Sequence, residues 1–184
     1  MNQVINTIYE RKSVRKFLKD QLSEQDIKII VEAGIQAPSG HNSQSVYYTI
    51  VQNADLINYI NEKGKEQMRK SDIDWIRNLG NNERYHLLHS APTVIVVSAK
   101  EDAYSPIEDC SAAIQNMLLA AKSLEIGSAW VELINHYFTL DECKKDLNIK
   151  DGYKPHYAVC LGYENKEKII NKPERNLNVY EWIK

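Results

Sequence analysis

Apolar positions along the N-terminal part of the chain recur three and four residues apart, which is the spacing of a helix that buries one face. This pattern predicts a short helix over residues 2–10 and a longer one over residues 23–37. The second helix opens with Ser23 and Asp26, three residues apart, which is the spacing of a capping box. Pro38 follows directly and is expected to end it, since the residue before a proline is disfavoured in helical geometry.

A third helix is predicted over residues 107–124, where alanine, leucine, isoleucine and methionine cover much of the surface. Ser105 and Pro106 fit the cap and the first position of this helix. Gly127 lies just beyond its end, where helices often close in left-handed geometry. The spacing over residues 54–89 is also helical, but it is interrupted around residues 78–82.

Other stretches show the composition of strands. Residues 46–51 are β-branched and aromatic, and residues 128–133 and 156–163 are predicted as two further strands. Residues 93–99 form a continuous apolar run whose two faces we expect to be covered. Helices and strands alternate irregularly, which favours an α+β fold over a regular doubly wound sheet. A glycine-rich dinucleotide fingerprint and a phosphate loop with lysine are both absent from the sequence.

Composition narrows the class of protein. The 184 residues fit a single domain, with 43% hydrophobic and 26% charged residues, and a net charge of -2 argues against a general nucleic-acid binder. Three widely spaced cysteines, Cys110, Cys143 and Cys160, indicate neither a disulfide framework nor a metal site, and a reduced, cytoplasmic setting is expected. No apolar run approaches the roughly 20 residues that span a bilayer, so no membrane partner is expected.

The segment "RKSVRKF" lies between two predicted helices. If it is extended, Arg11, Ser13 and Arg15 share one face, while Lys12 and Val14 share the other. Two guanidinium groups beside a hydroxyl suit a phosphate or another oxyanion. The alternative is a solvated basic stretch that binds nothing.

Two further segments carry candidate binding groups. In "APSGHNSQ", Asn42 and Gln44 offer amide donors and acceptors that suit the rim of a flavin, although an ordinary turn would have the same composition. In the tail, Lys172 and Arg175 of "KPER" could close a phosphate site from the far end of the chain, and the alternative is a solvated tail.

Taken together, "RKSVRKF", "APSGHNSQ", "DCSAAIQNMLLAAKSLEIGSAW" and the K-P-x-R tail resemble the nitroreductase family of FMN-dependent oxidoreductases over nearly the whole chain. The resemblance implies an α+β fold with a mixed β-sheet flanked by helices. It also implies one domain over residues 1–184, in an intertwined homodimer whose C-terminal extension, about 164–184, lies on the partner and whose FMN sites are shared.

The resemblance also assigns cofactor-binding residues. The N-terminal and tail residues would hold the FMN phosphate, the ribityl chain or the ring edge, residues 38–44 would reach the flavin of the other subunit, and residues 130–133 would lie beside the isoalloxazine. The assigned residues are Arg11, Lys12, Ser13, Arg15, Pro38, Ser39, Gly40, Asn42, Gln44, Trp130, Val131, Glu132, Leu133, Lys172 and Arg175.

The implied chemistry belongs to the flavin. NADH or NADPH would reduce N5, near a backbone N–H of Glu132 or Leu133, and an electron-poor acceptor such as a nitroaromatic or a quinone would follow in ping-pong order. No catalytic side chain and no metal are implied, and His41, His86 and His136 are expected to be loop or packing residues. The alternatives are a specialised family member, such as a dehalogenase or enone reductase, and a flavin-binding sensor or storage protein with little turnover.

Overall fold

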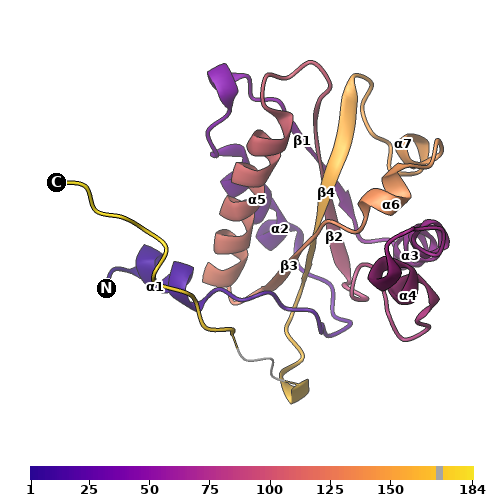
Figure 1. Cartoon of the computed structure of the whole chain (residues 1–184), viewed down its shortest axis with the longest axis horizontal. Coiled ribbons are helices and arrows are strands. Elements are labelled where there is room, and N and C mark those ends of the chain that lie inside the picture. The colour runs from indigo at the N-terminus through magenta and orange to yellow at the C-terminus, as the bar shows by residue number, and fades with distance from the viewer. Residues whose placement is uncertain (169–171) are drawn as a thin grey trace.

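A four-stranded sheet forms the centre of the computed structural model, which describes residues 1–168 and 172–184 (Figure 1). Its strands follow the order β1-β2-β4-β3, and every neighbouring pair is antiparallel. The four strands are β1 (Val46–Val51), β2 (Thr93–Lys100), β3 (Gly127–Val131) and β4 (Tyr153–Gly162). All four were predicted from the sequence, with small differences at their ends.

Helices cover both faces of the sheet, so the predicted α+β class is confirmed (Figure 1). One face packs against α2 (Glu24–Ile35) and α5 (Pro106–Ser123). The other packs against α3 (Ala54–Met68), α4 (Asp74–Asn81), α6 (Asn135–Phe138) and α7 (Cys143–Asp146). Single 3-10 turns, η1 (Gly40–Asn42) and η2 (Lys166–Lys168), complete the chain together with α1 (Gln3–Glu10). Within the described ranges, no helix combines the length and the apolar character needed to cross a membrane.

Strand β2 shows why its sequence is apolar without alternation. Val94 and Val96 face the layer of α3, α4, α6 and α7, whereas Ile95 and Val97 face α2 and α5. All four side chains have an exposed fraction of 0%. The expectation that both faces of this strand are covered is therefore confirmed.

The N-terminal segment after α1 runs beside β3. Ser13 forms a parallel bridge with Ser128, and the Val14 N–H donates to the carbonyl of Ser128 at 2.9 Å. A mixed sheet was predicted, with parallel and antiparallel strands. In the described chain the four strands are all antiparallel, and the parallel pairing is this isolated bridge.

Gly127 has a different role from the predicted one. The left-handed residue after α5 is Glu125, with a φ of 59°, and Gly127 instead begins β3. A Cβ atom at Gly127 would lie 2.9 Å from Cγ1 of Val14. Glycine is therefore required here because the N-terminal segment approaches the strand too closely for any side chain.

The two ends of the chain lie side by side and away from the main body (Figure 1). Helix α1 contains no buried residue, and the exposed fraction of Val4 is 64%. The tail is equally open, with exposed fractions of 75% for Trp182 and 93% for Ile183. The predicted apolar side chains of α1 are therefore covered only in part within the described chain, where the helix contacts α5.

Candidate active site

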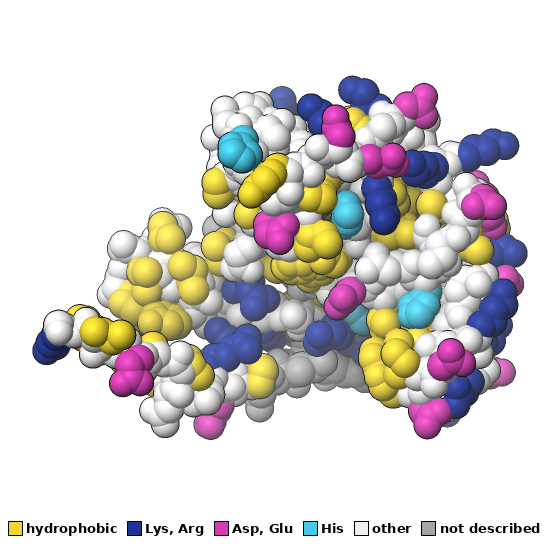
Figure 2. All heavy atoms as spheres, turned by 45° about the horizontal axis from the view of Figure 1, so that its top comes forward, with side chains coloured by type: hydrophobic (Ala, Val, Ile, Leu, Met, Phe, Trp, Pro, Cys, Tyr) yellow, Lys and Arg dark blue, Asp and Glu magenta, His cyan; other side chains and the backbone are white. Residues whose placement is uncertain are grey.

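A cluster of cations forms where the tail passes the end of α1. The Lys172 ammonium donates to the carbonyl of Tyr9, which brings the tail to the start of the "RKSVRKF" segment. Arg175 lies near Arg11, and burial together with the positive charge of Arg175 lowers the pKa of Arg11. Figure 2 shows lysine and arginine side chains gathered in the hollow between the terminal segments and the main body. The structure thus brings together predicted phosphate ligands from opposite ends of the sequence.

These guanidinium groups lack anionic partners among the described residues. The ion pairs and side-chain hydrogen bonds of the described chain leave Arg11, Arg15 and Arg175 without a carboxylate or carbonyl acceptor. Like charges held close together without a counter-ion destabilise one another, and a phosphate dianion would reverse that effect. The donor set therefore fits the phosphate end of a nucleotide such as FMN.

Arg15 connects this cluster to the segment around His89. After the parallel bridge of Ser13 with Ser128, the chain passes to the end of β4, where Phe17 forms a bridge with Glu164. Arg15 also lies close to His89, where burial and then the charge of Arg15 lower the histidine pKa to about 4. The R-x-S-x-R segment therefore lies beside β3, the strand that leads to residues 130–133.

Residues 130–133 offer backbone groups more than side chains. Trp130 packs against the α2 and α5 side of the sheet, 5.1 Å between ring centroids from Tyr157, and Val131 is buried in the opposite layer. Glu132 is exposed and Leu133 is half-buried. Within the described ranges, neither of the last two residues donates its amide N–H to a turn or loop acceptor. These two N–H groups are therefore open to a ligand.

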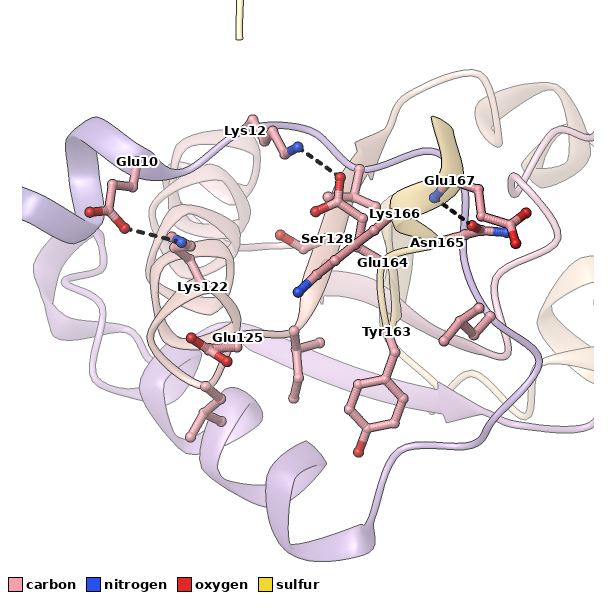
Figure 3. A pocket seen from close by; sticks show the side chains of 15 residues that line it. Glu10, Lys12, Lys122, Glu125, Ser128, Tyr163, Glu164, Asn165, Lys166 and Glu167 are labelled. Atoms are coloured by element: carbon pink, nitrogen blue, oxygen red, sulfur yellow. Dashed lines mark hydrogen bonds and ion pairs between the residues drawn. The ribbon is translucent and has the colours of Figure 1, made fainter. Parts of the chain in front are cut away.

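Lys12 differs from its neighbours. It lines a cavity of about 740 Å³ with Val14 and Ser128, and its ammonium pairs with Glu164 at 2.7 Å (Figure 3). A second pair, Lys122 with Glu10 at 3.1 Å, lies at one side of the same cavity. Arg11, Ser13 and Arg15 do not line it, as the alternation of an extended segment requires. Lys12 was counted among the cofactor ligands, yet its side chain lies on the other side of the segment from them.

The loop of residues 38–45 lies at the other end of the molecule from the cation cluster (Figure 1). Within one chain the structure therefore does not bring Pro38, Ser39, Gly40, Asn42 and Gln44 to the phosphate ligands. The amides of Asn42 and Gln44 are exposed and bind no other described side chain. Pro38, Ser39 and Gln44 line a separate cavity of about 260 Å³.

The inner side of this loop is held by a residue that the sequence analysis did not single out. The buried carboxylate of Asp109 accepts hydrogen bonds from the Gly40 N–H at 2.8 Å, the Ser45 hydroxyl at 2.6 Å, the Ser43 hydroxyl at 3.3 Å and the Ser105 hydroxyl at 3.2 Å. In the sequence Asp109 is an acidic residue in the first turn of α5, which is a favourable position for helix stability alone.

A second missed residue supports the region near Arg15. Lys65 of α3 has an exposed fraction of 3%, and its ammonium donates to the carbonyls of Asn82 at 2.9 Å and Tyr85 at 3.1 Å. These bonds fix the segment that leads to His89. No pattern in the sequence points to this role, since Lys65 lies among other charged residues in a polar stretch.

Comparison with known proteins finds relatives that cover nearly the whole chain. A protein of Archaeoglobus fulgidus, provisionally named an NADH dehydrogenase/NAD(P)H nitroreductase, is 28% identical over 181 residues, which cover 97% of this chain and 95% of the relative. A nitroreductase with bound FMN from Bacteroides fragilis NCTC 9343 is 30% identical with a TM-score of 0.89, and one from Desulfitobacterium hafniense DCB-2 is 28% identical with a TM-score of 0.91. Both structures match this chain over 100% of each chain.

The chain also matches a model of a whole protein family. The model of the nitroreductase family matches residues 8–163, a range that includes the R-x-S-x-R segment, the loop of residues 38–45 and the end of β3. This range is well over half of the 184 residues. The chain belongs to the nitroreductase family.

Proposed function

We propose that this protein is an FMN-dependent NAD(P)H oxidoreductase that reduces an electron-poor acceptor. The observation that carries the proposal is the convergence of Arg11, Lys172 and Arg175 without an anionic partner among the described residues. Family membership makes the chain a flavin-dependent oxidoreductase, and the cation cluster supplies a place for the phosphate of the flavin nucleotide.

Each part of the site has a distinct task. The cluster of Arg11, Lys172 and Arg175 binds the phosphate, with the Ser13 hydroxyl as a short directional donor. Arg15, two residues beyond Ser13, would reach the ring. The open N–H groups of Glu132 and Leu133 would donate to the ring edge and favour its electron-rich form, as fixed dipoles do wherever negative charge develops.

The bound flavin would supply the redox chemistry, accepting a hydride at N5 from NADH or NADPH and passing it to an acceptor such as a nitroaromatic or a quinone. The protein contributes binding, orientation and electrostatic stabilisation, and no side chain is required as acid, base or nucleophile.

We also propose that the complete site forms between two copies of the chain. The apolar residues of α1 and the tail, such as Val4 and Trp182, are exposed beside the cation cluster, and large exposed apolar patches mark interfaces. The loop of residues 38–45 is far from the cluster in its own chain, so a partner could supply it. In this arrangement residues 1–184 form one domain, and the segment from about 164 is an arm.

The test is the visible absorption spectrum of the purified full-length chain, before and after anaerobic addition of NADH or NADPH. We expect a flavin spectrum that bleaches with at least one nucleotide. A flavin spectrum that persists with both nucleotides would refute the reductase and support a binding protein with little turnover. A protein that acquires no flavin even when FMN is supplied would refute the cofactor assignment itself.

A further inference from the structure

Asp109 holds the loop of residues 38–45 from inside the protein. The carboxylate has an exposed fraction of 3% and accepts four hydrogen bonds, three of which come from the loop through Gly40, Ser43 and Ser45. The fourth comes from Ser105, at the cap of α5. No lysine or arginine is paired with it among the ion pairs of the described chain.

This pattern requires an ionised carboxylate. Burial raises the pKa of Asp109, but the bonds from Ser45, Gly40, Ser105 and Ser43 lower it by more, so the net direction is downward. A buried charge is tolerated only when its lone pairs are satisfied, and hydrogen bonds to a charged acceptor are stronger than neutral ones. Asp109 therefore binds the loop more firmly than a neutral residue of its size would.

The loop has a backbone that needs such support. His41, Asn42 and Gln44 have φ values of 52°, 54° and 47°. These values lie in the left-handed region, which residues other than glycine rarely occupy. Strained backbone of this kind persists only where the surrounding structure fixes it. Gly40 is also seated tightly, since a Cβ atom there would lie 2.3 Å from the Ser105 hydroxyl oxygen.

The outer side of the same loop carries the exposed amides of Asn42 and Gln44. We propose that Asp109 is a positioning residue that fixes the loop of residues 38–45 in the conformation that binds the flavin, before the flavin arrives. Asp109 does not touch the flavin, and the loop carries its effect. The inference rests on the proposed function, in which this loop contacts the flavin ring.

Asp109→Ala is the primary variant, and Glu108→Ala is its matched control, because Glu108 is an exposed carboxylate on the same helical turn. Flavin-free protein is titrated with FMN and with riboflavin, and binding is followed by flavin fluorescence. We expect Asp109→Ala to weaken both ligands by about 10-fold, since the loop would contact the ring that they share. Asp109→Asn should restore part of the affinity, and Glu108→Ala should match the wild type.

Amide hydrogen exchange in the flavin-free protein provides a readout independent of the cofactor. The Gly40 amide should exchange at least about 10-fold faster in Asp109→Ala, with thermal unfolding as a measure of overall stability. Faster exchange at Gly40 together with unchanged affinity for both flavins would overturn the positioning role. An effect on FMN but not on riboflavin would overturn it as well, because it would point to the phosphate.

Ser45→Ala keeps the proposal testable if Asp109→Ala fails to fold. It removes the bond of 2.6 Å, the shortest of the four, and we expect about a threefold loss of affinity for both ligands. Wild-type affinity in Ser45→Ala would then contradict the proposal. If the wild-type protein binds no FMN, the proposed function fails and the inference falls with it. If the wild type binds FMN and the Asp109 and Ser45 variants bind it equally well, the inference alone fails.

Discussion

Replacing Arg11 with glutamine separates the phosphate contact from the rest of the flavin site. In the flavin-free protein the guanidinium of Arg11 binds no other described residue and is repelled by Arg175. Arg11→Gln therefore breaks no contact of the fold and relieves a repulsion. We expect the free energy of unfolding of the flavin-free protein to be unchanged or slightly raised.

The effect on binding should be large in comparison. A hydrogen bond to a charged group contributes about 1.5–3 kcal/mol, which corresponds to roughly 10- to 150-fold in a dissociation constant. Arg11 is half-buried, so solvent screening places the expected loss in the lower part of this range, about 10- to 30-fold for FMN. Riboflavin lacks the phosphate, so its affinity should change by less than about twofold.

The assay is fluorescence titration of flavin-free protein with both ligands, at two salt concentrations. Lys28→Gln is the control, because it removes an exposed charge from α2 whose partner Glu32 lies 3.9 Å away. The FMN dissociation constant of the wild type should rise with salt more steeply than that of Arg11→Gln. Equal losses for FMN and riboflavin, or no loss at all, would refute the phosphate role of Arg11.

Three further predictions address other parts of the molecule. The pKa of His89 is lowered from 6.5 to about 4, so between these values the unfolded chain binds a proton that the folded chain does not, and the free energy of unfolding falls as the pH drops. In urea denaturation, His89→Gln should show a weaker dependence of this free energy on pH than the wild type. An equal dependence in the two proteins would contradict the pKa assigned to His89. Lys65→Met leaves two carbonyls without a donor and should lower the free energy of unfolding by about 1–3 kcal/mol. The control is Lys63→Met, which replaces a half-buried lysine on the same helix and should change this free energy little. Equal losses in the two variants would count against the role of Lys65. Removal of residues 172–184 should weaken FMN binding and shift the mass measured by light scattering from dimer to monomer, and an unchanged flavin-loaded dimer would exclude the tail from the site.

The elements that the sequence predicts well are those governed by local rules. Ser23 caps α2 by accepting from the Asp26 N–H, as the capping box predicts, and Pro106 stands at the start of α5. The continuous apolar run of β2 is buried on both faces. Even the separation of Lys12 from Arg11 and Ser13 follows from the two-residue alternation of an extended chain.

What the sequence leaves undetermined depends on contacts between distant residues. Asp109 binds Gly40 and Ser45 across 69 and 64 positions of sequence, and no periodicity encodes such a pairing. The glycine at position 127 looks like a helix end until the approach of Val14 is known. Lys65 resembles its charged neighbours because its carbonyl partners lie 17 and 20 residues away.

The bridge between Ser13 and Ser128 has a consequence for solubility. Strand β3 lies at the edge of the sheet, where unpaired backbone groups are a template for pairing with another chain. The N-terminal segment covers this edge, and the same segment presents Arg11 and Arg15 to the proposed phosphate and ring sites. A bound nucleotide would hold the cover in place, and its loss would free the edge. Cofactor depletion and aggregation would then be two results of one event, the detachment of a single stretch of backbone.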